Sequence, residues 1–581
     1  TNPAEYTYDY TIDFGDGTVL NNQTGDVTHT YTSPGNYTVS ISGVFPHFYS
    51  KGFYAFNNHN EKLKTVEQWG DNQWKSMEGA FYYCVNMILN SLDTPNLSQV
   101  SSMSRMFERA FMFNSDINSW DVSNVNDMSF VFFDAESFNQ PLNNWNVSNV
   151  TNMAFLFRGA ELFNQPLDNW DTLNVTTMNG MFNLASEFNY PLNNWNISNV
   201  TNLSGMFAGA SSFNQLLDNW NTSSVTNMHQ LFAGASSFNQ PVENWDISNV
   251  ISIWGMFSNA SSFNQPLNNW DVSGINDMFF MFNGASSFNQ PLNNWNVSNV
   301  TNMAGMFQDA SSFNQNLNNW DISSLDNMVG MFKNAITFNH PLDNWNISNV
   351  NILCTTQNGF LEGATSFNQD ISNWNFNTSS LPKFIDDSGM SSDNYDLLIS
   401  NLISLGLNDG TLGAENIEYC DAFTRQQLIN AGWTITDGGL ASGCDLNYVS
   451  GNVLYDEADN GCDPNDFNLS NYLINVNNGT DDASFDLDKN GQYVIGLDSG
   501  NYTLSILNLD SNFTSTPTTQ TVNFAGQNEI IDDVDLCITA NQLFDDLSID
   551  IFPLEDAIPG FETNYQVVMT NNGSQIVPSI Q

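Results

Sequence analysis

A polar residue follows a regularly recurring tryptophan through the middle of the chain, as in "NNWDVSG" at 268–274. It lies between two apolar residues, so in a brief strand it would point outward from the sheet. A column of carboxylates and amides at sheet spacing could bind a cation or sugar hydroxyls, and a solvated polar face is the alternative. The candidate residues are Asp121, Asn146, Asp171, Asn196, Asn221, Asp246, Asp271, Asn296, Asp321 and Asn346.

A second group of candidate residues crowds a loop near residue 460. Calcium takes six to eight oxygen ligands, and four aspartates in one loop offer several of them. The candidate ligands are Asp456, Asp459, Asp463 and Asp466. The nearby "DLDKNG" resembles the start of an EF-hand loop, but its twelfth position is Leu497, so the closing glutamate is missing and we reject an EF-hand there.

Large aromatic residues stand at a few places where most repeats have glycine or another small residue. They are Phe130, Phe155, Trp254, Phe279 and Phe280. If exposed, they would form a patch for a partner. The alternative is that they fill local gaps in the core.

The composition offers little for catalysis. The 581 residues include five His and 11 Lys and Arg, and we find no P-loop, H-E-x-x-H, G-x-S-x-G or Cys-x-x-Cys motif. Carboxylates abound, so composition leaves a glycosidase-like pair open. An aspartate that recurs once in each repeat, however, does not build one asymmetric site. We therefore expect a non-enzymatic protein without a cofactor other than calcium.

The net charge of −51 limits the classes of binding partner that we expect. Nucleic acid and anionic lipid both need clustered basic residues, so neither is expected. No apolar run is long enough to span a membrane, so we expect no membrane insertion. Because strand-like sequence runs up to both ends, we expect the chain to be a segment of a longer or processed protein.

The tryptophans that position these candidates define a repeat. Every twenty-fifth position from Trp120 to Trp345 is a tryptophan, and the next one, Trp374, comes later because residues are inserted between Leu353 and Ala364. A fixed period over some 300 residues is typical of a repeat array, in which neighbouring units stack to bury their apolar faces.

Within one unit the spacing predicts the local structure. Residues 150–160 have the apolar spacing of a short helix or 3₁₀ turns, and residues 145–147 alternate as in a brief strand. Buried columns of Trp, Phe and Met should result. An asparagine follows the second Phe in every unit, and we expect its amide to connect one turn to the next.

The text "SFNQPLNNWNVSNVTNMAGMF" at 287–307 resembles the 25-residue units of BspA-like leucine-rich-repeat bacterial surface proteins, over about residues 44–445. The resemblance implies a leucine-rich-repeat-like solenoid with short parallel strands and short helical or 3₁₀ turns, displayed at the cell surface. It implies adhesion to host, matrix or cell-surface partners. It supplies no catalytic residues.

Both flanks resemble β-sandwich modules. "YTIDFGDGTVL" and "HTYTSPGNYTVSIS" resemble a PKD-like module, and "FDLDKNGQYVIGLDSGNYTLSI" resembles a Cna-B or SdrD-B-type prealbumin-like stalk module. Between the repeats and the second module, Ser391 or Ser392 begins a predicted helix, and Cys420 and Cys444 enclose a short loop and should pair. Cys462 and Cys537 flank the prealbumin-like module and should connect its first strand to its last.

The predicted domains are therefore a PKD-like segment (1–43), an N-terminal cap (44–96), eleven repeats (97–375), a C-terminal cap (376–445), a prealbumin-like β-sandwich (446–540) and the start of a further β-sandwich stalk module (541–581). This combination resembles large exported proteins of Gram-negative gliding-type bacteria, which implies type IX secretion and an extracellular or cell-surface location.

Three functions stay open. The first is an adhesin whose repeats bind an extracellular protein or glycan. The second is a spacer or scaffold of a surface, secretion or motility assembly. The third is an accessory module of a polysaccharide hydrolase.

Overall fold

The computed structural model describes residues 5–50, 60–444, 446–456, 461–463, 466–541, 547–553 and 565–571, the last two ranges by their backbone alone. The chain divides into two units. One comprises Thr1–Met390 with Leu412–Ile417, and the other comprises Ser391–Thr411 with Glu418–Gln581.

The N-terminal part of the first unit is a small antiparallel sheet in the order β2-β1-β3, made of β1 (Asp9–Asp13), β2 (Val19–Gln23) and β3 (Ser40–Val44). Alternation along β1 and the residue before it buries Tyr8, Tyr10 and Ile12 against Phe14 and Phe45. A 3₁₀ helix η1 (Asn60–Lys62) and the parallel pair β4 (Thr65–Val66) and β5 (Ile88–Leu89) follow.

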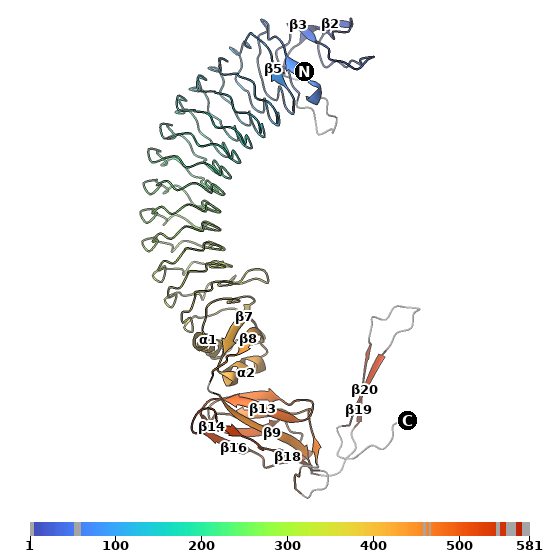
Figure 1. The fold of residues 1–581 in the computed structure, drawn as a ribbon, viewed down its shortest axis with the longest axis vertical. Helices are drawn as coiled ribbons and strands as arrows, with labels where there is room; N and C mark the ends of the chain where they lie inside the picture. The colour runs from blue at the N-terminus through green and yellow to red at the C-terminus, as the bar shows by residue number, and fades with distance from the viewer. Residues whose placement is uncertain are drawn as a thin grey trace. The chain divides into compact units, whose positions relative to one another are not determined.

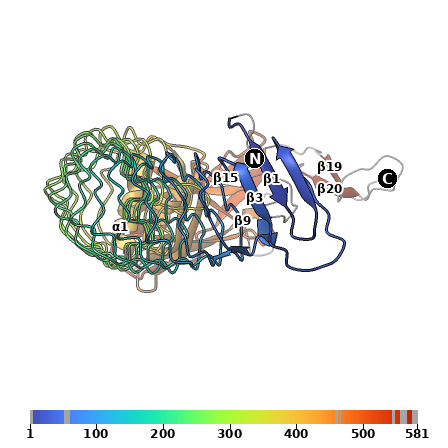
Figure 2. The same cartoon turned by 90° about the horizontal axis from the view of Figure 1, so that it is seen from above.

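Residues 76–375, here called the repeat stack, form successive coils that lie over one another (Figures 1 and 2). Isolated parallel bridges connect equivalent residues of neighbouring units, such as Asp127 with Asn152 and Asn302 with Asn327. No strand or helix runs through the coils of residues 90–375.

The predicted fold class, a leucine-rich-repeat solenoid flanked by all-β sandwiches, is wrong. The regular elements of the described residues are short strands in small separate sheets, with two α-helices and one 3₁₀ helix. Residues 145–147 form no strand, and residues 154–159 form turns rather than a helix. The bridge lies at Asn152 instead, next to the turns.

The physical reason is the backbone of the turns. Phe155 and Gly159 have φ angles of 56° and 68°, and two such left-handed residues recur four apart in nearly every unit. The N–H groups of Phe155 and Phe157 bond to Asn179 and Met181 of the next unit, whereas the N–H of Leu156 bonds back to Met153. Neither an α-helix nor an extended strand accommodates left-handed residues at this spacing, because both need negative φ at every residue.

Side-chain columns fill the interior of the repeat stack. One Phe column, from Phe107 to Phe332, has ring centroids 5.4–5.8 Å apart, and the second, from Phe113 to Phe338, has them 5.8–6.1 Å apart. The tryptophans are buried beside them, and from Trp145 onward each indole N–H donates to a carbonyl of the preceding unit, as Trp170 does to Leu142 at 3.0 Å. The predicted aromatic columns are confirmed.

The asparagine column is also confirmed. The backbone N–H of Asn164 donates to Oδ1 of Asn139 at 3.0 Å, and the same bond recurs in every unit from Asn139 to Asn368 at 2.9–3.1 Å. Each side chain thereby satisfies a backbone donor of the next unit.

After the repeat stack the chain forms β6 (Ser380–Leu381), α1 (Ser392–Ser404), β7 (Thr411–Tyr419), α2 (Ala422–Asn430) and β8 (Thr434–Leu440). Ser391 caps α1 by accepting the N–H of Asn394, as predicted, and Asp421 caps α2. Neither α-helix of the described residues has the length and apolar character that crossing a bilayer requires.

The second unit continues as a β-sandwich. One sheet contains β9 (Asn447–Tyr455), β10 (Phe467–Asn468), β13 (Gln492–Leu497), β15 (Phe513–Thr516), β17 (Ile530–Ile531) and β18 (Leu536–Ala540). The other has the order β12-β11-β14-β16, from β11 (Leu473–Asn477), β12 (Asp482–Asp486), β14 (Gly500–Leu507) and β16 (Gln520–Phe524). Val449, Ile474, Leu504 and Ile538 are fully buried between the two sheets.

Both predicted disulfides are present, Cys420–Cys444 and Cys462–Cys537. The second attaches β18 to the segment that follows β9, and these two strands pair in parallel. Further along the chain, β19 (Leu547–Pro553) and β20 (Tyr565–Asn571) pair as an antiparallel two-stranded sheet.

Candidate binding face of the repeat stack

The polar residues that follow the tryptophans are exposed, as predicted, but each is engaged in its own turn. In all ten, a side-chain oxygen accepts the backbone N–H of the residue two positions later, at 3.0–3.2 Å. Hydrogen bonds from the hydroxyl and the N–H of the following serine lower the pKa of Asp121, Asp246, Asp271 and Asp321. The turns therefore account for this polar column without a ligand.

The predicted calcium loop is described in part. Asp456 accepts the N–H of Gly461 at 2.8 Å, and Asp466 accepts the N–H of Asp463 at 2.8 Å. Asp459 lies outside the described residues. In the part of the chain that the structure describes, no three His, Cys, Asp or Glu side chains are grouped closely enough to hold a metal ion.

The aspartates of the PKD-like segment also support turns. Asp13 accepts the N–H of Gly15, and Asp16 accepts the N–H of Thr18 and lies 2.8 Å from Nε2 of His29. The bond with His29 and the N–H of Thr18 lower the pKa of Asp16. We assign both residues to turn structure.

The repeats differ from one another mainly along one surface, here called the turn face. It consists of residues 104–109 and the equivalent segment of each following unit, up to 329–334. The third and fourth residues of each segment, such as Met106 and Phe107, are buried. The four Arg and Lys residues of the repeat stack all lie on this face, at Arg105, Arg109, Arg158 and Lys333.

The predicted aromatic candidates also lie on the turn face, in two clusters. Phe130, Phe155 and Phe280 occupy a left-handed position, with φ between 53° and 59°, where five other units have glycine. A left-handed backbone at a residue with a side chain costs roughly 1–2 kcal/mol. The repeat stack therefore carries these aromatic rings at the expense of backbone strain.

The first group, here called the arginine-paired cluster, comprises Arg105, Phe130, Phe133, Phe155 and Arg158. The guanidinium carbon of Arg105 lies 4.1 Å from the centroid of the Phe130 ring, which stacks on Phe155 at 4.9 Å. Arg158 lies 4.5 Å from the centroid of Phe133. Arg105 also pairs with Glu108 at 2.7 Å, and Arg158 pairs with Asp134 at 3.2 Å, so both cations are neutralised.

The second group, here called the open aromatic cluster, comprises His229, Trp254, Phe279 and Phe280, all partly exposed. The ring centroids lie 5.8 Å apart for His229 and Trp254, 6.3 Å for Trp254 and Phe279, and 4.1 Å for Phe279 and Phe280. Phe280 lies over Gly305, where a Cβ would collide with the ring. Among the described residues, no Arg or Lys lies over these four rings.

The predictions missed Arg105, Phe133, Arg158 and His229. Their signal was available in the sequence, because all four fall in the variable turn segment and three of them are rare residue types in the repeats. The pairing of Arg105 with a ring of the next unit, however, depends on how units stack.

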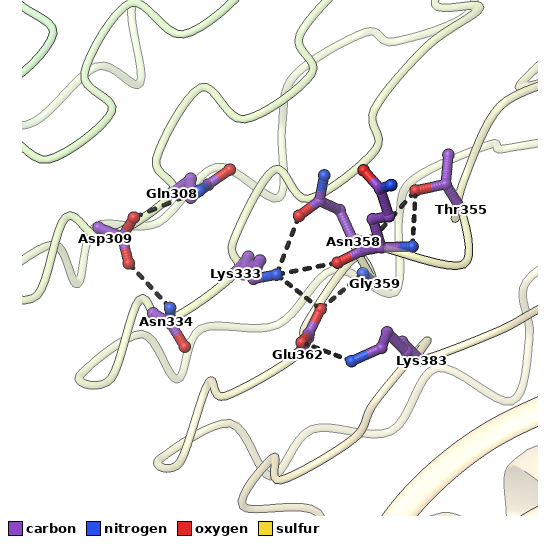
Figure 3. Close-up of polar contacts among 10 residues, drawn as sticks. Gln308, Asp309, Lys333, Asn334, Thr355, Asn358, Gly359, Glu362 and Lys383 are labelled. Atoms are coloured by element: carbon purple, nitrogen blue, oxygen red, sulfur yellow. Dashed lines mark hydrogen bonds and ion pairs between the residues drawn. The ribbon is translucent and has the colours of Figure 1, made fainter.

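Charged residues near the end of the repeat stack satisfy one another (Figure 3). Glu362 lies 3.0 Å from Nζ of Lys333 and 3.1 Å from Nζ of Lys383, and accepts the N–H of Gly359 at 3.0 Å. Burial raises the pKa of the Glu362 carboxyl, but these hydrogen bonds outweigh burial and hold the pKa below its usual value. Lys333 also donates to Asn358 of the inserted segment, so this cluster attaches the insert to the repeat stack.

Comparison with known protein families assigns the repeats to a family. Residues 75–195, 185–294 and 264–374 each match the family model described as "Mycoplasma protein of unknown function, DUF285". Together these matches cover more than half of the chain. The chain belongs to the DUF285 family.

Each DUF285 match is about 110 residues long and therefore spans several of the 25-residue units. Residues 1–42 match a PKD domain, a type of domain typical of extracellular proteins. Neither curated proteins nor solved structures gave a significant match. The BspA-like assignment does not follow from these matches.

Proposed function

We propose that this DUF285 protein is a non-enzymatic adhesin, exposed at a bacterial cell surface or secreted, whose turn face binds an extracellular protein or glycan. The observation that carries the proposal is the open aromatic cluster. Partly exposed rings at Trp254, Phe279 and Phe280 stand where most other units have small residues or glycine, and Phe280 adds backbone strain. Rings that the core does not require and that strain the backbone are typical of binding sites.

The location is inferred from chemistry and domain type. Two disulfides require an oxidising compartment, and the PKD domain is typical of extracellular proteins. The likeness of the repeats to BspA-like proteins, and of the whole arrangement to exported proteins of Gram-negative gliding-type bacteria, supports cell-surface display and type IX secretion.

A binding screen with the full chain tests this function. The chain and a variant carrying Trp254→Ala and Phe280→Ala are compared on a glycan array and in pull-downs from extracellular matrix and cell-surface fractions. We expect at least one ligand that the chain retains and the variant loses. Retention of no ligand by either protein would contradict the proposal.

The alternative is a spacer or scaffold of an exported surface, secretion or motility assembly. The polar residues after the tryptophans favour it, because all ten are occupied by their own turns and leave a uniform face. If the chain is such a spacer, it should retain no ligand in the binding screen, and binding would belong to other parts of the full protein. The third hypothesis, an accessory module of a polysaccharide hydrolase, is tested by incubating the chain with a panel of polysaccharides. Absence of released products would contradict that hypothesis.

A further inference from the structure

The two aromatic clusters of the turn face differ in one respect, namely what lies on their rings. In the arginine-paired cluster, guanidinium groups of the chain itself lie 4.1 Å and 4.5 Å from the centroids of Phe130 and Phe133. In the open aromatic cluster, no described Arg or Lys occupies the equivalent place. The first cluster therefore shows, within this protein, which chemical group fits rings held in this framework.

The surroundings of the open aromatic cluster are strongly negative. Residues 159–332 contain 12 Asp and Glu but no Lys or Arg. Asp277 lies two residues before Phe279 and accepts its N–H, and the exposed Asp309 belongs to the same turn as Gly305, under the Phe280 ring. An approaching cation would be attracted over this whole stretch.

The arrangement of the rings also favours a cation. Neighbouring rings are inclined to one another by 70°, 34° and 33°, so they do not form the single flat platform on which a sugar ring stacks. Several inclined aromatic faces beside carboxylates are typical of sites for ammonium and guanidinium groups.

We propose that the open aromatic cluster binds an arginine side chain of a basic segment in a partner protein. This inference rests on the proposed adhesin function and names its partner class. The guanidinium would lie against the exposed parts of the Trp254, Phe279 and Phe280 rings, because Phe280 is itself in contact with Phe279 at 4.1 Å and with Gly305. The net charge of −51 would speed the encounter.

Fluorescence anisotropy with the full chain tests the inference. The probe is a labelled decapeptide of alternating arginine and glycine, and its matched control contains citrulline, which has nearly the shape of arginine but no charge. We expect the arginine peptide to bind, its binding to weaken with added salt, and the citrulline peptide not to bind.

Variants separate the cluster from general attraction by the acidic surface. Phe280→Gly and Trp254→Ser introduce residue types that other repeats already carry at these positions, so the fold and the net charge are kept. We expect each to weaken binding of the arginine peptide by roughly tenfold. The matched control, Phe130→Gly in the arginine-paired cluster, should change binding less than twofold.

Three results would overturn the inference. Equal binding of the arginine peptide by all variants would show attraction to the acidic surface only. Glycan binding that Phe280→Gly and Trp254→Ser abolish, without binding of the arginine peptide, would refute the basic partner and leave the adhesin function standing. Absence of any ligand, peptide or glycan, would refute both.

Discussion

In the repeat stack a buried ring contacts its counterparts one unit before and one unit after it, whereas in the β-sandwich a buried side chain contacts strands far away in the sequence. Phe207 lies 5.8 Å and 5.6 Å from Phe182 and Phe232, its counterparts in the two neighbouring units. Val453 of β9 lies opposite Leu536 of β18. The first core is a sum of equivalent local contacts, and the second depends on closing a long loop.

This difference decides where each region can vary. A repeat that changed an inward residue to one of a different size would break a column shared with two neighbours, so variation is greatest on the turn face. The described residues of the sandwich form no such columns, and a disulfide joins distant parts of its chain instead.

Phe207→Ala should produce the largest effect. The ring is fully buried in the middle of a column, so its removal should lower the free energy of unfolding of the repeat stack by about 3–5 kcal/mol. Hydrogen exchange measured during urea unfolding would show which units of the repeat stack lose stability. Phe279→Ala, at a partly exposed position that several units fill with serine or alanine, should cost much less. Equal losses of unfolding free energy in Phe207→Ala and Phe279→Ala would contradict the distinction between the buried column and the turn face.

Replacing both Cys462 and Cys537 with alanine should destabilise the sandwich by about 2–4 kcal/mol, because the disulfide closes a separation of 75 residues. Thermal unfolding by calorimetry should show a lower transition for the sandwich and an unchanged one for the repeat stack. The control, Cys84→Ala, changes a buried free thiol at a position where the repeats carry alanine, and should leave both transitions nearly unchanged. If the double variant also shifted the unfolding transition of the repeat stack, the conclusion that the sandwich and the repeat stack have independent cores would be contradicted.

Asn239→Ala should cost about 1–3 kcal/mol, because it leaves the N–H of Asn264 without its acceptor in the asparagine column. Faster hydrogen exchange at Asn264 would be the direct measurement. Asn296→Ala is the matched control, since its side chain is exposed and serves only its own turn. The column would lose its structural role if both variants behaved alike.

Asp396→Asn should give the smallest effect, visible as a change in pH dependence. Burial raises the pKa of Asp396 to about 6, so the folded second unit holds a proton there that the unfolded chain releases near pH 4. Stability should therefore fall as the pH rises from about 4 to about 6, and the loss should persist above that range. Thermal unfolding between pH 4 and pH 7 should show a weaker slope in the variant, which keeps an acceptor for the N–H groups of Cys420 and Asp421. An unchanged slope would show that another group titrates.

Much of the repeat interior could be predicted, because spacing alone identifies the inward residues. Trp170, Phe157 and Phe163 recur with the period and are buried, and Asn139 bonds to Asn164 as expected. The backbone could not be predicted from the same spacing. Glycine marks only some of the left-handed positions, and residues with side chains, such as Phe130, Phe155 and Asp134, occupy the others. A leucine-rich-repeat fold was therefore expected where the chain forms alternating turns.

The sequence by itself determined the length of the repeat, the residues that fill the core, the two cysteine pairs and the acidic charge, because each depends on residue type and spacing along the chain. Only the tertiary structure decided which aromatic rings are covered. Arg105 lies over Phe130 because stacking places equivalent turns of neighbouring units in contact, and no comparable cation of the described residues lies over Trp254 or Phe280. Contacts between units, rather than the content of any one unit, separate the arginine-paired cluster from the open one.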